Sequence, residues 1–182
     1  MKKTFAMILM SAAAIGLAGQ VMAATPEAKA TYKAANDLAT SDYKIAHAKC
    51  EGLTGNPKDV CIAEAKAARI YVEANAKAQY KNTLSARTSA TKSIADANYD
   101  VDKAKCGSMT GNDKDVCIKK AKATKVAAVA NATADKKVVE ARTDARDDKK
   151  TAEYKVALEK CDTLAGAAKD TCVAAAKTQF GK

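Results

Sequence analysis

The spacing of apolar and polar residues divides the chain into a short apolar start and a long helical remainder. Residues 5–17 are largely apolar, and from residue 27 onward Ala is distributed among Lys, Asp and Glu. Ala and Lys both favour helices. No Gly or Pro interrupts residues 27–49, where Leu38 and Ile45 contribute to a weak apolar stripe. This pattern predicts a first helix over residues 27–49.

Two further spans favour long helices. Pro57–Lys105 and Asp113–Lys160 contain no internal Gly or Pro, and each would be roughly 70 Å long as one continuous helix. Clusters of Asn, Thr, Ser and Asp at residues 82–91 and 131–135 are the places where such helices would break. We favour long, bent helices, and the sequence leaves open three separate hairpins, each a small repeat unit.

One 24-residue unit occurs three times, at residues 43–66, 99–122 and 154–177, and its first copy reads YKIAHAKCEGLTGNPKDVCIAEAK. Each copy predicts a helix, a tight turn and a second helix. A glycine in each turn permits a left-handed backbone, and Asn56 and Asn112 are predicted N-caps of the second helices. The tyrosines of the unit lie two helical turns before a cysteine, so they are predicted to pack beside the seam of each hairpin: Tyr43, Tyr99 and Tyr154.

These turns predict an elongated all-α fold of antiparallel helical hairpins with long central helices. Each hairpin turn reverses the chain, so two continuous central helices would place the first and third turns at one end and the second at the other. The short first and last helices would then flank the same half of the central pair. This topology predicts a four-helix half and a two-helix half.

All six cysteines lie within the repeated unit. In an exported chain, three pairs of identical spacing are typical of a disulfide framework. The repeat favours local pairing over the other arrangements. Each bond closes a loop of about a dozen residues, worth roughly 3 kcal/mol in the chain-entropy model. The predicted pairs are Cys50 with Cys61, Cys106 with Cys117, and Cys161 with Cys172.

Other interpretations of the cysteines are weaker. Positions eleven apart also share a face of one uninterrupted helix, as in proteins whose helices are joined by paired disulfides, but the turn glycines argue against it. There is no C-x-x-C motif and only one histidine, so we predict no metal, haem or other cofactor. A redox-active pair remains an alternative, although it lacks the arrangement that lowers a thiol pKa.

The N-terminus resembles a secretory signal. Lys2 and Lys3 precede the apolar stretch, and residues 21–23, Val-Met-Ala, form a small-residue cleavage site. The stretch is too short for a membrane anchor. We therefore predict a signal peptide at residues 1–23, a single helical domain at residues 24–182, no transmembrane segment in the mature chain, and a periplasmic or secreted location.

Charge restricts the partners. The chain carries 31 basic and 21 acidic residues, a net charge of +10. Removal of residues 1–23 takes away two lysines and no acid, leaving +8. The charges are mixed, as in a solvated helical surface, and they permit attraction to anionic envelope polymers. No basic run is interleaved with aromatic residues, so a dedicated nucleic-acid site is not predicted.

Candidate catalytic chemistry is scarce. His47 is the only histidine, and its repeat equivalents are Lys103 and Leu158. No nucleophile, paired-acid or phosphate-loop motif accompanies it, so we predict no catalytic residue and a non-enzymatic protein. The repeated turn lysines are candidate ligand contacts, because no structural role accounts for them: Lys58, Lys114 and Lys169.

The signal sequence, the Ala/Lys-rich composition and the repeated K-C-x2-[LM]-[TA]-G-x2-K-D-x-C unit together resemble small secreted proteins of Gram-negative bacteria. Some of these largely uncharacterised proteins are labelled TolA-like. The resemblance extends from about Tyr43 to Phe180. It implies a periplasmic location, and it implies no established activity and no catalytic residues.

Three functions follow as hypotheses. The favoured one is a structural or interaction protein of the cell envelope that binds or spaces envelope components, including anionic polymers. The second is a holdase chaperone for exported proteins, and the third is a disulfide redox protein. The oligomeric state is not predicted.

Overall fold

The computed structural model describes residues 25–182, and the predicted signal peptide at residues 1–23 lies outside this range. The described chain contains five α-helices, one 3-10 turn and no strand. The elements in order are α1 (Pro26–Cys50), α2 (Gly55–Lys81), α3 (Leu84–Lys105), η1 (Cys106–Ser108), α4 (Gly111–Cys161) and α5 (Gly166–Phe180). The predicted all-α class is confirmed.

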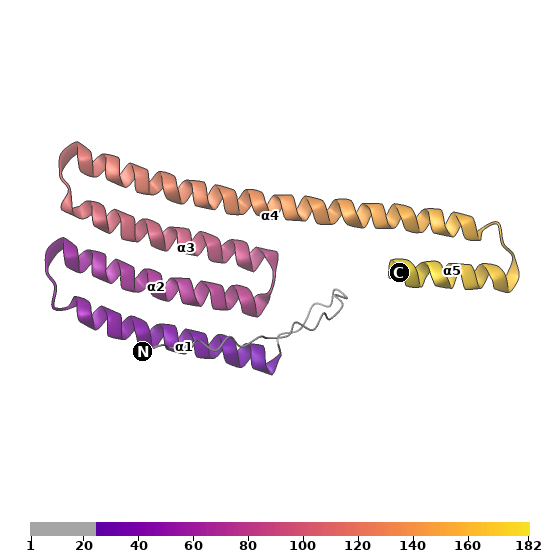
Figure 1. Ribbon diagram of the computed structural model, residues 1–182, viewed down its shortest axis with the longest axis horizontal. Helices are drawn as coiled ribbons and strands as arrows, with labels where there is room; N and C mark the ends of the chain where they lie inside the picture. The colour runs from indigo at the N-terminus through magenta and orange to yellow at the C-terminus, as the bar shows by residue number, and fades with distance from the viewer. Residues whose placement is uncertain (1–24) are drawn as a thin grey trace, which may run out of the picture.

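The helices lie side by side in a single antiparallel layer (Figure 1). Extensive packing joins only helices that follow one another in sequence: α1 with α2, α2 with α3, α3 with α4, and α4 with α5. A layer one helix thick leaves both of its faces exposed to solvent. Small residues in the seams therefore form what core there is.

The first of the two predicted long helices is broken, and the continuous helix favoured for residues 57–105 is wrong. The chain reverses at Asn82, whose left-handed backbone (φ 44°) ends α2. Thr83 then caps α3, accepting a hydrogen bond at Oγ1 from the amide of Ala86 (3.1 Å). The break falls within residues 82–91, where the sequence indicated a weak point.

The second predicted long helix is continuous. α4 comprises 51 residues and is about 76 Å long. The predicted weak point at residues 131–135 does not break it, since Ala132 is buried and the Thr133 hydroxyl donates to the carbonyl of Val129 (2.8 Å) within the helix.

The extra reversal changes the predicted topology. The first and second repeat turns lie at one end of the layer and the third lies at the other (Figure 1), so the predicted placement of the turns is wrong. A four-helix part and a two-helix part do exist, but α5 belongs to the smaller one. We call α1, α2, α3 and residues 111–133 of α4 the four-helix block, and residues 150–180 the arm. Between them, residues 134–149 of α4 contain no buried residue and form the bare segment.

The buried side chains are small. Apart from Val101 and Thr88, they are alanines and cysteines: Ala39, Cys50, Ala65, Ala78, Ala90, Ala95, Ala97, Cys106, Ala121, Ala132, Cys161 and Ala176. Ala lets two helix backbones approach closely, so each seam is tight but buries little apolar area. Aromatic pairs supplement it, such as Tyr32 of α1 stacked on Tyr80 of α2 with ring centroids 4.9 Å apart. Within residues 25–182, no helix has the length and apolarity needed to cross a membrane.

Candidate functional site: the three clamped turns

Each repeat turn is closed by the disulfide that the sequence predicted. The Cα atoms are 5.6, 5.8 and 5.6 Å apart in Cys50–Cys61, Cys106–Cys117 and Cys161–Cys172, within the usual range for a disulfide. The first cysteine of every pair is at most 1% exposed. Each clamp therefore joins the end of one helix to the start of the next beneath a covered seam.

The start of the second helix differs from its predicted form. Gly55 has φ +60° and opens α2, and the repeat-equivalent glycines open α4 and α5 in the same way. The capping position of α2 is Thr54, whose side chain makes no capping hydrogen bond. Asn56 lies inside the first turn of α2 and Asn112 inside that of α4, so both predicted N-caps are wrong.

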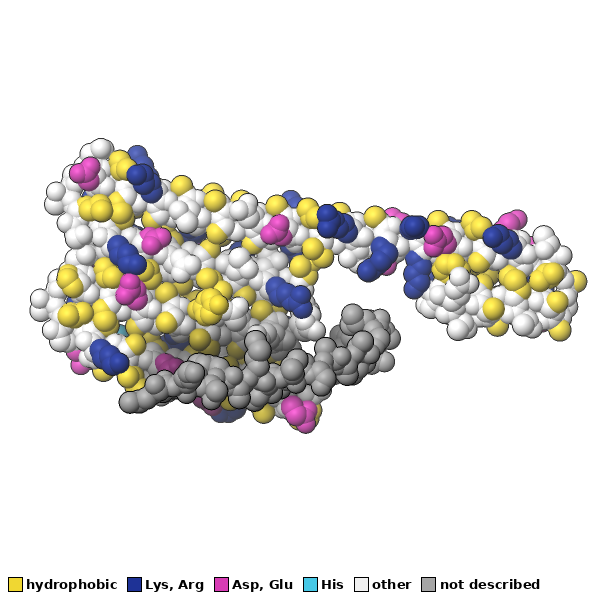
Figure 2. Space-filling view, viewed as in Figure 1, with side chains coloured by type: hydrophobic (Ala, Val, Ile, Leu, Met, Phe, Trp, Pro, Cys, Tyr) yellow, Lys and Arg dark blue, Asp and Glu magenta, His cyan; other side chains and the backbone are white. Residues whose placement is uncertain are grey.

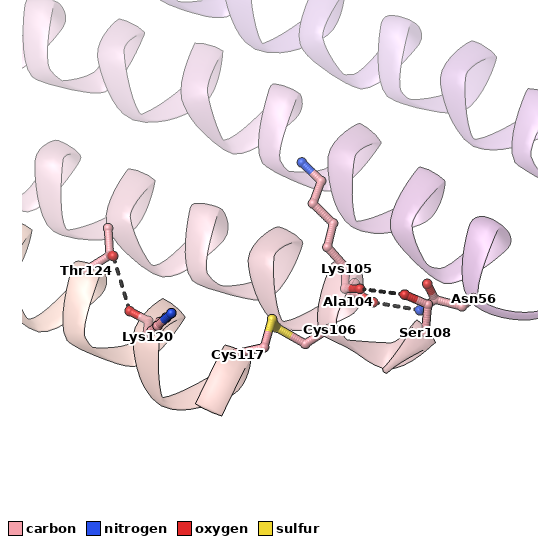
Figure 3. Close-up of a disulfide and its surroundings, with 8 residues drawn as sticks. All are labelled: Asn56, Ala104, Lys105, Cys106, Ser108, Cys117, Lys120 and Thr124. Carbon is pink, nitrogen blue, oxygen red and sulfur yellow. Dashed lines mark hydrogen bonds between the residues drawn. A yellow bond between two sulfur atoms is a disulfide. The ribbon is translucent and has the colours of Figure 1, made fainter. Parts of the chain in front are cut away.

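Asn56 instead joins the first turn to the second (Figure 3). Its Nδ2 donates to the carbonyl oxygen of Ala104 at the end of α3 (2.6 Å). A Cβ at Gly107 would lie 2.3 Å from the same nitrogen, so this contact requires glycine there. Nearby, Lys105 Nζ of α3 lies 3.2 Å from Glu64 Oε1 of α2. These contacts align the two hairpins of the four-helix block.

The three candidate lysines are not brought together. Lys58 and Lys114 lie at the shared end of the block, whereas Lys169 lies at the far end of the arm. Lys58 is half-buried and Lys114 is exposed. Lys169 Nζ lies 3.0 Å from Asp162 Oδ1 across its own turn. A role for these lysines in ligand binding stays a prediction, and it would involve separate contacts rather than one site.

The repeated tyrosines lie across the hairpin seams, as predicted. Arg69 lies over the ring of Tyr43, 5.1 Å from its centroid, and Lys125 lies over Tyr99 at 5.3 Å. In the third copy Phe180 contacts Tyr154 with centroids 5.9 Å apart. The three partners occupy equivalent positions, eight residues after the second cysteine of each copy. The sequence pattern did not reveal these partners, because the three copies share the position of the partner but not its residue type.

Of these partners, Lys125 also forms an ion pair with a neighbouring helix. Its Nζ lies 2.7 Å from Asp96 Oδ1 on α3. The hydrogen bond that Lys125 donates to Asp96 is the main cause that raises the pKa of Lys125, and the charges of Asp96, Tyr99 and Asp100 add to it. The pair links α3 to α4 at the surface, where such pairs contribute little to stability.

An open groove of about 680 Å³ lies along the arm between α4 and α5. Its lining is mostly apolar, with Val156 and Phe180 as the largest apolar side chains, and Glu153 and Lys160 are the charged residues in it. His47 contacts only Tyr43 among the aromatic residues described (centroids 5.5 Å apart). Among residues 25–182, no three His, Cys, Asp or Glu side chains are grouped so that they could hold a metal ion.

Comparison with known proteins adds no assignment. No family model matches the sequence, and no curated protein and no solved structure matches the chain. The resemblance to secreted Ala/Lys-rich repeat proteins therefore stays a prediction.

Proposed function

We propose that this chain is a non-enzymatic structural or interaction protein of the cell envelope, exported by its N-terminal signal, that binds anionic envelope polymers. Its shape supports this proposal. A single layer of helices offers two long exposed faces, and the three disulfides hold the helix pairs without a thick core. Such a framework suits contact with extended polymers better than enclosure of a small substrate.

The observation that carries the proposal is the basic first half of α4. Between Asp115 and Asp135 it has four lysines and no acidic residue. Three of them are exposed and belong to none of the ion pairs seen within residues 25–182: Lys119, Lys120 and Lys122. Elsewhere on α4 acidic side chains lie among the basic ones (Figure 2). An uncompensated cluster attracts polyanions through a field that salt screens.

The test is binding to purified lipopolysaccharide and peptidoglycan over a range of salt concentrations. We expect the variant with Lys119, Lys120 and Lys122 all replaced by Gln to bind at least several-fold more weakly than wild type at low salt. A control with Gln at Lys33, Lys136 and Lys149 has the same net charge, and these lysines already pair with acids four residues on. Equal loss in both variants would reject the cluster as the binding site.

A third variant tests the lysines of the turns. Lys58, Lys114 and Lys169 all replaced by Gln also removes three positive charges. If these lysines contact the polymer, binding falls below that of the control variant. Binding equal to the control would show that they contribute only net charge.

A holdase function is the second candidate, because large apolar side chains are exposed on the layer. Leu38, Tyr71 and Val156 are 60%, 58% and 56% exposed. Unfolded exported chains present apolar segments that such side chains could hold. Suppression of aggregation of an unfolded outer-membrane protein would support it, and no protection at several-fold excess would reject it.

A further inference from the structure

The outer flank of α1 is an uncovered apolar edge of the layer. It consists of Ala34, Leu38, Ser41 and Ile45, which we call the α1 edge. All four residues are exposed, with Leu38 at 60% and Ile45 at 56%. Because α1 makes extensive contacts only with α2, nothing within residues 25–182 covers this edge.

The repeat shows how the same edge is covered elsewhere in the molecule. The second copy of the repeat lies 56 residues after the first, so the residues of α3 equivalent to the α1 edge are Ala90, Ile94, Ala97 and Val101. Ala97 is 5% exposed and Val101 is 8% exposed, because this flank of α3 packs on α2. Ile45 and Val101 thus hold equivalent positions, and their exposed fractions differ because a further helix packs only against Val101.

The flank of α2 that covers α3 can be recognised in the other repeats. It includes Glu64, paired with Lys105, and Ala67, which lines a groove together with Ala97. The equivalent flanks on the two other second helices are exposed at all six of their positions. The flank of α2 is Val60, Glu64 and Ala67; that of α4 is Val116, Lys120 and Ala123; that of α5 is Thr171, Ala175 and Thr178.

The α4 flank is unsuited to the α1 edge. Docking in the manner of α2 on α3 would place Asn112 where Asn56 lies and Glu51 where Gly107 lies. A Cβ at that glycine position is only 2.3 Å from the asparagine nitrogen. It would also set Lys49 against Lys120, where α3 and α2 have the Lys105–Glu64 pair. Steric overlap and like charge therefore oppose this contact.

The α5 flank removes both obstacles. It carries Ala167 at the position of Asn56, which leaves room for Glu51, and Ala175 at the position of Glu64, which sets no charge against Lys49. The hydroxyls of Thr171 and Thr178 donate to carbonyls within α5, at 2.8 and 3.0 Å. Their methyl groups are then available for apolar packing.

The α5 of the same molecule does not reach the α1 edge, because α1 lies in the four-helix block and α5 lies in the arm at the other end of α4 (Figure 1). We propose that the α1 edge packs against α5 of a second copy of this chain, repeating the packing of α3 on α2. A twofold axis perpendicular to the layer then forms the contact twice, with each α1 against the other copy's α5. Such an isologous arrangement closes as a dimer.

The dimensions permit this arrangement. Where α3 packs on α2, the end of α3 lies beside the start of α2, so the two helices are antiparallel. The same packing places the end of the second copy's α1 beside the start of α5. These two helices are therefore also antiparallel, as the twofold axis requires. α1 is about 37 Å long, and α5 and the bare segment extend about 22 and 24 Å. The second α1 therefore fits beside α5 and part of the bare segment without reaching the end of α2. The two copies would form one continuous layer.

The first test is the mass of the oxidised mature chain by light scattering and sedimentation over a concentration series. We expect twice the chain mass for wild type, and the mass of one chain for Ile45→Asp. Val126→Asp is the matched control, because Val126 is 55% exposed and lies on α4 outside the proposed contact; it should remain a dimer. Helix content by circular dichroism verifies that each variant is folded. A monomeric wild type, or a dimer that Ile45→Asp leaves intact, overturns the proposal.

The second test is a rescue. Ala167→Asn places an asparagine opposite Glu51 and should weaken the dimer at least tenfold. Adding Glu51→Gly recreates the pair found at Asn56 and Gly107 and should restore dimerisation. Both single variants and the double variant alter only the arm or the first turn, so unchanged disulfides and helix content are the folding check. If Ala167→Asn does not weaken dimerisation, the proposed dimer is contradicted. It is also contradicted if the oligomers keep growing with concentration, which is the result expected from packing of α1 on α4.

Discussion

Asn56 and Gly107 together determine how the first two hairpins meet. The amide of Asn56 binds the end of α3 in a space that exists only because residue 107 has no side chain. The equivalent positions are Glu51 in the first copy and Asp162 in the third. The residues that differ between the copies, and not the residues that the copies share, thus determine which hairpins can pack together.

Gly107→Ala should lower the free energy of unfolding by about 1 kcal/mol, because Asn56 must give up its hydrogen bond to make room. In an Asn56→Ala background the same change should cost nothing. Urea unfolding followed by circular dichroism measures both. Gly52→Ala is the control, since no atom lies within 4 Å of the position of its Cβ. An equal loss in both backgrounds would show that the cost does not involve Asn56.

Asp96→Asn should lower the pKa of Lys125, since the hydrogen bond that Lys125 donates to the Asp96 carboxylate is the main cause of its elevation. A lysine whose pKa is raised on folding stabilises the protein below its ordinary pKa, and this contribution is lost as pH rises through the folded-state value. Alkaline titration of the Lys125 side chain by NMR measures the change. Asp100→Asn removes a charge that raises the pKa of Lys125 less than Asp96 does, so it should lower this pKa by a smaller amount. A larger decrease with Asp100→Asn would contradict the assignment of Asp96 as the main cause.

At the scale of elements, the reversal between α2 and α3 decides the topology. Residues 57–105 have the composition of one helix, yet the left-handed Asn82 and the capping Thr83 divide it. The reversal allows α2 and α3 to bury Ala78, Ala90 and Ala97 in seams, which a straight helix would leave exposed on at least one side. Tertiary packing therefore outweighs helical continuity here.

Thr83→Ala should destabilise the protein by about 1 kcal/mol, the usual cost of losing an N-cap hydrogen bond. Thr91→Ala is the control, because Thr91 is exposed within α3 and its hydroxyl donates only to the carbonyl of Arg87 in the same helix. Thermal unfolding by circular dichroism compares the two. A loss of the same size for both would mean that Thr83 acts through helix propensity and not as a cap.

At the scale of the whole molecule, the two ends of the layer differ in how their turns are supported. The clamps of the first and second turns lie in adjoining hairpins held by α2 and α3, whereas the third turn belongs to the arm, where α5 packs on α4 alone. Local stability should follow the same division, because α5 has 15 residues and packs on only one helix of its own chain.

Replacing Cys161 and Cys172 by Ser should therefore unfold α5 locally and leave the four-helix block folded. Removing a disulfide that closes a loop of this size costs about 3 kcal/mol. Hydrogen exchange should show loss of protection in residues 166–180 only. The matched variant with Ser at Cys106 and Cys117 should instead lower protection throughout the block; the same pattern in both variants would contradict the division.

The sequence alone predicted the local structure well. The periodic Ala and Lys residues, the turn glycines and the equally spaced cysteines indicated helices, hairpin turns and three local disulfides, because each of these depends on interactions within a few residues. The tyrosine seams were predicted for the same reason. The repeated lysines were marked as candidates from the pattern alone, and the structure places them at separate ends of the molecule.

What only the tertiary structure decided is how the hairpins are arranged. Ala-rich flanks are so alike that sequence periodicity does not distinguish a helix that continues from one that turns back, nor the flank that meets a partner from the flank that meets water. The choice rests on a few contacts between distant residues, such as Asn56 with Ala104 and Glu64 with Lys105. Local propensity determined the helices and clamps of this protein, and long-range packing determined that they form an open layer with a separate arm.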